Sequence, residues 1–166
     1  MLAYTKDASY STAVFPKAVV FAQKSSDVGL ILEWANNNKV PVTVRGAGTG
    51  KSGGCIPDEN GIVLSMERLN SVLEIDTNNK MVVTQPGVIL NDLQEACLSE
   101  NLWLPLDPSS QDKCTIGGMV IENAGGPRAL KYGVTGDYVC GLEGYFGDGK
   151  PFKFGGKLYK DVAGYD

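Results

Sequence analysis

Histidine is absent from this sequence. Imidazole is the common general base, proton shuttle and metal ligand near neutral pH, so schemes that use it are excluded within these residues. The four cysteines (Cys55, Cys97, Cys114 and Cys140) are widely spaced and form no Cys-x-x-Cys pair. That spacing argues against structural zinc and predicts free thiols. We therefore name no catalytic base and no metal site from the sequence.

Excess positive charge and long apolar runs are missing as well. Lys and Arg number 15 against 19 Asp and Glu, a formal net charge of −4, and no basic cluster marks a nucleic-acid-binding surface. No apolar run approaches the ~20 residues of a membrane span, and residues 1–10 lack the apolar core of a signal peptide. We expect a cytoplasmic protein with no nucleic-acid partner and no membrane span.

Glycine is the residue in excess, at 21 of 166, against a usual share of about 7%. Such an excess usually means that backbone approaches another group closely or adopts positive φ. The 43% hydrophobic and 20% charged residues are otherwise typical of one soluble globular domain. Disorder, collagen and coiled coil are excluded.

The first part of the chain predicts a βαβ unit. Residues 18–23 form an expected buried strand, a serine at 25 or 26 caps a helix that reaches about Asn38, and 40–45 is the next strand. Short connections predict that these two strands are parallel neighbours. Residues 61–66 are expected to add a third strand to the same sheet.

From Val72 the pattern changes. Residues 72–76 and 81–85 predict an antiparallel hairpin around a Thr-Asn-Asn-Lys turn. Asn91 or Asp92 is expected to cap a helix to about Glu100. Residues 105–126 read as mostly turn, and strands near 140–146 and 151–154 flank a Gly-Asp-Gly-Lys turn. We expect two subdomains, 1–70 and 71–166.

The most informative segment is RGAGTGKSGG at 45–54, directly after a predicted strand. Its Gly-Lys-Ser resembles part of a P-loop, but the first glycine of that motif would fall on Arg45 and no apolar-periodic helix follows. Gly48, Gly50 and Gly53 match G-x-G-x-x-G, yet the Rossmann fingerprint also needs that helix. A glycine-rich surface turn is the simple alternative for one isolated loop.

The glycine loop does not stand alone. PLDPSS at 105–110 and TIGGMVIENAGG at 115–126 are two further segments of small residues. An extended ligand that contacts several backbone loops explains all three segments better than three separate turns without a function. Because successive N–H groups in such loops form anion-binding nests, the residues predict a cofactor that contains a pyrophosphate.

Taken in order, five segments resemble the FAD-binding PCMH-type domain of the vanillyl-alcohol oxidase superfamily: 41–54, 82–94, 105–110, 115–139 and 155–166. Within it they are similar to the group that comprises glycolate oxidase, D-lactate dehydrogenase and D-2-hydroxyglutarate dehydrogenase. The resemblance implies an α+β fold of two α/β subdomains, which is not Rossmann. A small parallel βαβ sheet precedes a mixed or antiparallel sheet with helices, and FAD lies between them. Relatives with covalent flavin usually carry histidine in the first loop, so non-covalent FAD is expected.

The resemblance also implies site residues, by position. The pyrophosphate is expected on the backbone of Arg45, Gly46, Ala47, Gly48, Thr49 and Gly50, with Ser52 and Gly53. The flavin side is bordered by Pro86, Gly87 and Val88. The flavin and its ribityl-phosphate arm are lined by Asp107, Pro108, Ser109, Thr115, Ile116, Gly117 and Gly118. The cofactor continues along Asn123, Gly125, Gly126, Tyr132, Gly133 and Asp137 to Val139, whose backbone approaches adenine.

Some positions depart from the family pattern or leave alternatives open. Met119 stands where this group commonly has Asn, which removes one polar contact near the cofactor. Cys55 and Cys114 are far more readily explained as buried thiols than as a link to flavin. Lys51 either contacts phosphate or is solvated. Arg128 either approaches an acidic substrate or the flavin, or forms a surface ion pair.

The resemblance implies an enzyme that oxidises a 2-hydroxy acid of the glycolate or D-lactate type by hydride transfer to flavin N5, with an electron-acceptor subunit among its partners. In this group the base and the carboxylate-binding groups lie in a substrate cap and C-terminal segments, which these residues do not include. We therefore expect an N-terminal fragment with an incomplete second subdomain. The alternative functions are a non-catalytic FAD- or nucleotide-binding module, or partner subunit of a flavoprotein complex, and, third, a P-loop nucleotidase.

Overall fold

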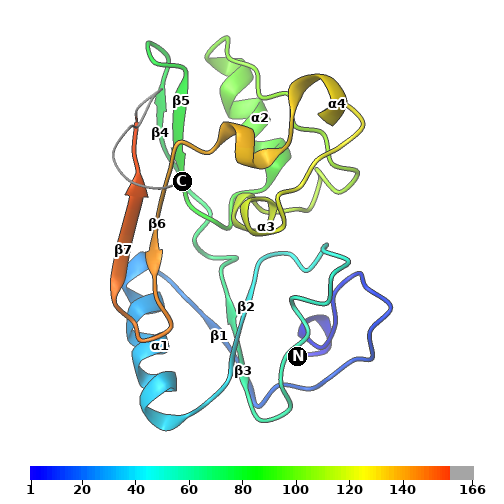
Figure 1. Ribbon diagram of the computed structural model, residues 1–166, viewed down its shortest axis with the longest axis vertical. Coiled ribbons are helices and arrows are strands. Elements are labelled where there is room, and N and C mark those ends of the chain that lie inside the picture. Colours follow the sequence, from blue (N-terminus) through cyan, green and yellow to red (C-terminus); the bar gives the residue numbers. More distant parts are fainter. Residues whose placement is uncertain (158–166) are drawn as a thin grey trace.

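The computed structural model describes residues 1–157 (Figure 1); the resemblance at 158–166 lies outside these residues. The first half contains η1 (Leu2–Tyr4), β1 (Ala18–Phe21), α1 (Ser25–Asn38), β2 (Val42–Arg45) and β3 (Ile62–Ser65). The second half contains β4 (Val72–Asp76), β5 (Met81–Thr84), α2 (Leu90–Ser99), α3 (Ile116–Glu122), α4 (Ala129–Tyr132), η2 (Thr135–Tyr138), β6 (Gly141–Tyr145) and β7 (Pro151–Gly155). The mixture of parallel and antiparallel sheets with helices confirms the α+β prediction.

The first sheet has the strand order β1-β3-β2, and both pairs are parallel. The expectation that β1 and β2 are neighbours is therefore wrong, because β3 lies between them. All four residues of β3, Ile62–Ser65, are buried, whereas β1 is only half-buried. A continuous apolar strand is best placed in the centre of a parallel sheet, where both edges and both faces are covered.

α1 covers this sheet, with Val28, Ile31 and Leu32 packed against a core cluster that includes Leu64. Its N-cap is Lys24 and not the expected serine. The Asp27 carboxylate accepts hydrogen bonds from the backbone N–H groups of Gln23 and Lys24, at 2.9 and 3.1 Å. An acidic side chain in the first turn thus provides the acceptor that a serine cap would have supplied.

The remaining strands form two separate antiparallel pairs, β4–β5 and β6–β7, as the sequence predicts. In Figure 1 the β6–β7 hairpin runs along the left edge, beside α1 below and β4–β5 above. The structure gives α1 a direct contact with β6. The boundary expected between residues 70 and 71 falls in the turn between β3 and β4 and stays a prediction.

α2 begins at Leu90, with Ile89 as N-cap, so neither Asn91 nor Asp92 caps it. The N–H groups of Leu90 and Asn91 donate to the carbonyls of Cys114 and Gln111, at 3.1 Å each. These tertiary hydrogen bonds satisfy the donors that a polar cap usually satisfies. α2 buries Leu90, Leu93 and Cys97 on one face.

α3 replaces part of the turn expected over 105–126. Thr115 is its N-cap, with Oγ1 accepting from the Gly118 N–H at 3.4 Å, and Asn123 ends it in the left-handed conformation at φ 48°. Met119 is 2% exposed and packs with Leu90 in a core cluster. The paired glycines concealed this helix in the sequence, because glycine lowers helix propensity while burial of Met119 favours the helix. None of the helices in residues 1–157 is long and apolar enough to cross a membrane.

Candidate functional site

The loop 46–61 follows β2 and contains neither helix nor strand. Among the described residues, the backbone N–H groups of 47–54 find no hydrogen-bond acceptor. Gly48 and Gly53 have positive φ, 70° and 84°. A residue of positive φ between residues of negative φ allows consecutive N–H groups to point toward one anion, as in an anion-binding nest, and the loop has two such positions. The segment can therefore hold an anion with its main chain.

The Arg45 side chain anchors the start of this loop. It is 5% exposed, its Nη2 donates to the Ala3 carbonyl at 2.9 Å, and its guanidinium lies 5.6 Å from the centre of the Tyr4 ring. A methyl group at position 48 would lie 2.1 Å from Nη2 of Arg45. The loop is thus packed directly on the guanidinium, which is turned inward and bonded to the protein itself.

Three segments of the sequence meet at this loop. A methyl group at Gly46 would lie 2.2 Å from Oγ1 of Thr115, so the loop touches the start of α3. The Gly117 N–H donates to the Pro86 carbonyl at 2.8 Å, and the Ile116 N–H to the Val88 carbonyl at 2.9 Å. The predicted pyrophosphate loop is thus joined to two of the three predicted flavin segments, to 115–118 directly and to 86–88 through 115–118.

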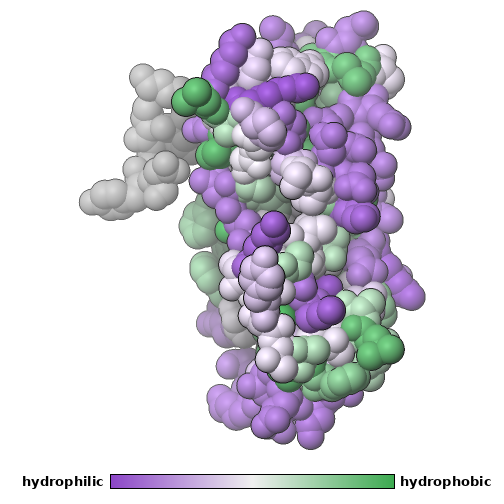
Figure 2. All heavy atoms as spheres, turned by 90° about the vertical axis from the view of Figure 1, so that its right-hand side faces the viewer, coloured by the Kyte–Doolittle hydropathy of each residue, from purple (hydrophilic) through white to green (hydrophobic). Residues whose placement is uncertain are grey.

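A cavity of about 480 Å³ opens where these segments meet. Four of its lining residues are expected site residues: Ala47, Thr49, Gly87 and Thr115. Six others were missed: Glu67, Asn70, Ile89, Asp92, Asp112 and Lys113. Of these six, Ile89 and Asp92 lie inside the matched segment 82–94 and Asp112 and Lys113 lie just before 115–139, whereas Glu67 and Asn70 lie outside the matched segments. Figure 2 shows the side of the molecule that lies at the right in Figure 1. There, mostly hydrophilic residues flank a band of residues of intermediate hydropathy.

The PLDPSS segment forms a second junction. Asp107 Oδ1 accepts from the backbone N–H of Arg128 at 3.1 Å, and Oδ2 lies 3.3 Å from Arg128 Nε. Gly126 packs against the Asp107 carbonyl. Of the two alternatives for Arg128, the structure shows the ion pair. Pro108 is buried and Ser109 exposed.

The remaining expected residues hold the segment 123–139 in shape. Oδ1 of Asn123 accepts from the Gly136 N–H at 2.8 Å, and Oδ2 of Asp137 accepts from the Val134 N–H at 2.7 Å. The Tyr138 hydroxyl donates to the Tyr132 carbonyl at 2.6 Å. The other members of this set are turn or packing positions: Gly125, Gly133 and Val139. The contact of their backbone with the cofactor stays a prediction.

A family model for the FAD binding domain matches residues 16–155. The chain belongs to this family. It is 46% identical to glycolate oxidase subunit GlcD of Bacillus subtilis, over 99% of this chain and 35% of that protein. It is 44% identical to a D-lactate dehydrogenase of Archaeoglobus fulgidus, over 89% of this chain and 33% of that protein. This FAD-binding domain thus spans about a third of the length of the curated relatives it matches.

Solved structures show the same fold at low sequence identity. An alkyldihydroxyacetonephosphate synthase has a TM-score of 0.77 at 21% identity, over 89% of this chain and 27% of that chain. The 6-hydroxy-D-nicotine oxidase of Arthrobacter nicotinovorans has a TM-score of 0.76 at 22% identity, over 93% of this chain and 33% of that chain. These matches confirm the predicted PCMH-type architecture and exclude a Rossmann fold for the FAD-binding domain.

FAD is the cofactor of this domain, and the open amides of 47–54 fit its pyrophosphate. Met119, in contrast, is 2% exposed and packs with Leu90 in the core. Burial raises the pKa of the Cys55 thiol more than the Arg45 guanidinium lowers it, and burial also raises the pKa of Cys114. Both thiols are free and remain protonated at neutral pH.

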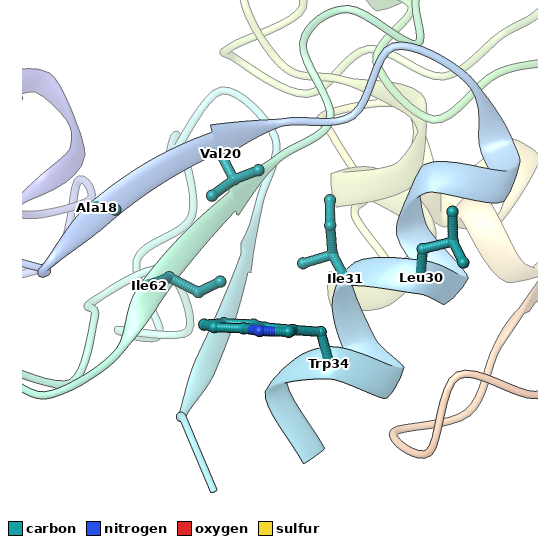
Figure 3. A pocket seen from close by; sticks show the side chains of 6 residues that line it. All are labelled: Ala18, Val20, Leu30, Ile31, Trp34 and Ile62. Carbon is teal, nitrogen blue, oxygen red and sulfur yellow. The ribbon is translucent and has the colours of Figure 1, made fainter. Parts of the chain in front are cut away.

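A second cavity, of about 340 Å³, lies between the first sheet and α1. Figure 3 shows Val20 and Ile62 on the strands opposite Ile31 and Trp34 on the helix. Every lining residue is apolar, so this cavity has no group that would bind a pyrophosphate. Among residues 1–157, no three His, Cys, Asp or Glu side chains gather where they could hold a metal ion.

Proposed function

We propose that this chain holds FAD with its pyrophosphate on the amides of 47–54, as the cofactor part of a protein that oxidises a 2-hydroxy acid of the glycolate or D-lactate type. The observation that carries the proposal is the row of amides that find no acceptor within the described residues, beside a cavity lined in part by residues of three glycine-bearing segments. The similarity to GlcD and to D-lactate dehydrogenase supports the substrate class. An electron-acceptor subunit and a cytoplasmic location are part of the same proposal.

When bound, FAD supplies the hydride acceptor, flavin N5, for oxidation of the hydroxy acid. The chain's own residues bind and orient it. The amides of 47–54 donate to the pyrophosphate oxygens, with Ser52 beside them. Gly87 of the segment Pro86–Val88 and Thr115 of the segment Thr115–Gly118 line the cavity, and Asp107 is held by Arg128. We assign the base that takes the hydroxyl proton to no residue of this chain.

The test is a titration of the chain with FAD, followed by absorption and by flavin fluorescence. Gly48→Ala is the blocking variant, because its methyl group would meet Arg45 Nη2 and its φ of 70° strains any side chain. Gly147→Ala is the matched control, since a methyl group there has nothing within 4 Å. We expect saturable binding by the wild type and the control, and weakened binding by Gly48→Ala with an unchanged circular dichroism spectrum.

Binding of FAD by Gly48→Ala at wild-type affinity would place the pyrophosphate elsewhere. In a protein of the relatives' full length, we expect the bound flavin to be reduced by glycolate, D-lactate or 2-hydroxyglutarate under anaerobic conditions. Binding of FAD without reduction by any hydroxy acid would favour the alternative of a non-catalytic flavin module.

A further inference from the structure

One side-chain contact ties the pyrophosphate loop to the second half of the molecule. The Ser52 hydroxyl lies 2.8 Å from Oε1 and 3.0 Å from Oε2 of Glu122. Ser52 is in the middle of the glycine loop, and Glu122 is the last residue of α3. The contact therefore joins two segments that are 70 residues apart in the sequence.

Glu122 lies alongside the loop without accepting hydrogen bonds from its backbone amides. Methyl groups at Gly50 and Gly54 would come within 3.8 and 3.4 Å of the Glu122 carboxyl group. None of the amides of 47–54 donates to that carboxylate in the described part of the chain. The carboxylate thus fixes the position of the loop through Ser52 and leaves the amides open to an incoming anion.

The rest of the loop is held at its ends. Gly46 packs on Thr115 at the start, and the Cys55 N–H donates to Asp7 Oδ2 at 3.4 Å at the end. Between them, the Gly50 carbonyl accepts from the Ala8 N–H at 3.1 Å. The anchors at Gly50 and Cys55 fix the loop to the N-terminal segment, and the Gly46 contact fixes its start to the N-cap of α3. The Ser52–Glu122 contact fixes its centre to the last residue of α3.

We propose that Glu122 is a positioning residue for FAD: acting through Ser52, it holds the amides of 47–54 in the arrangement that receives the pyrophosphate. The inference rests on the proposed function. A glycine-rich loop loses much conformational freedom when it closes on a ligand, and holding it beforehand strengthens binding. A carboxylate is a stronger acceptor for the serine hydroxyl than a neutral group.

The charge of Glu122 acts in the opposite direction. A carboxylate beside a pyrophosphate repels it, although solvent weakens the repulsion because Glu122 is exposed. Glutamine keeps an oxygen that accepts from Ser52 and removes the charge. Glu122→Gln is therefore expected to bind FAD as tightly as the wild type or more tightly, whereas Glu122→Ala loses the contact altogether.

The experiment is the FAD titration with a set of variants of the full chain. The set comprises Glu122→Ala, Glu122→Gln, Ser52→Ala, the Ser52→Ala/Glu122→Ala double variant, and Glu95→Ala as the matched control, an exposed glutamate on α2. We expect Glu122→Ala to weaken binding about tenfold, as loss of one charge-assisted hydrogen bond does, and Glu95→Ala to leave it unchanged. The double variant should bind no more weakly than Ser52→Ala, because Glu122 acts through Ser52.

Three results would overturn this role. Glu122→Ala binds as tightly as the wild type, or Glu122→Gln is as weak as Glu122→Ala, or the losses from Ser52→Ala and Glu122→Ala add in the double variant. Thermal unfolding of each variant is expected within a few degrees of the wild-type temperature, because loss of one exposed contact shifts a domain of this size no further. If the wild-type chain fails to bind FAD, the proposed function falls together with the inference. If only Gly48→Ala weakens binding, the proposed function stands and the inference falls.

Discussion

Gly117 and Gly118 are adjacent in α3, and substituting each by alanine separates a steric effect from helix propensity. A methyl group at 117 would lie 2.6 Å from Cβ and 3.1 Å from the carbonyl oxygen of Pro86, whereas one at 118 meets only Thr115 Oγ1, at 3.2 Å. Alanine favours a helix over glycine by about 1 kcal/mol at either position. Overpacking costs about 1–3 kcal/mol, and only Gly117→Ala forces α3 away from Pro86.

We therefore expect Gly118→Ala to be at least as stable as the wild type and Gly117→Ala to be less stable than Gly118→Ala by about 1–3 kcal/mol. Urea unfolding followed by circular dichroism measures both free energies of unfolding. Gly117→Ala should also weaken FAD binding, because its N–H bond to the Pro86 carbonyl joins two walls of the cavity. Equal stability of the two variants would refute the close approach of α3 to Pro86.

Two further predictions concern stability. Leu64 on β3 is fully buried, so Leu64→Ala should lower the free energy of unfolding by about 2–5 kcal/mol in urea, and a loss below about 1 kcal/mol would contradict its central place in the sheet. Burial raises the pKa of Asp7, but hydrogen bonds from Ser9 and from the Cys55 N–H outweigh burial and lower it. The carboxylate therefore stabilises the fold above the unfolded-state pKa of about 3.9 and loses this effect as pH falls through the folded-state pKa. The stability gap between wild type and Asp7→Asn should shrink between about pH 6 and pH 3, and a constant gap would rule this out.

Local patterns in the sequence were sufficient for most strands and for both hairpins. The β4–β5 hairpin, for example, is indicated by apolar alternation around Thr-Asn-Asn-Lys. Strand order was not predictable in this way, because β1 and β2 are each as suited to an edge as to the centre. The predicted helix caps were wrong for a related reason. The acceptor for the first N–H group of α2 is the carbonyl of Cys114, which only the tertiary fold brings close to it.

The candidate site, like the fold, was predictable only where local sequence patterns carry the signal. Ala47, Thr49, Gly87 and Thr115 belong to segments whose glycines and order carry the family resemblance, and they do line the cavity. Glu67, Asp92 and Lys113 line it too, yet exposed charged residues in a turn or at a helix start look alike wherever they occur. Glu122 was equally unpredictable, because its partner Ser52 is 70 residues away.

The order β1-β3-β2 has a consequence for how the chain assembles. Neither β1 nor β2 can pair until β3 exists, so a nascent chain that has emerged only as far as Arg45 carries two unpartnered strands and an uncovered face of α1. The glycine loop is the connection that must close before β3 reaches its place, and long-range closure of this kind slows folding. The loop that we propose as the pyrophosphate-binding segment is thus also the connection whose length sets how soon the first sheet can form.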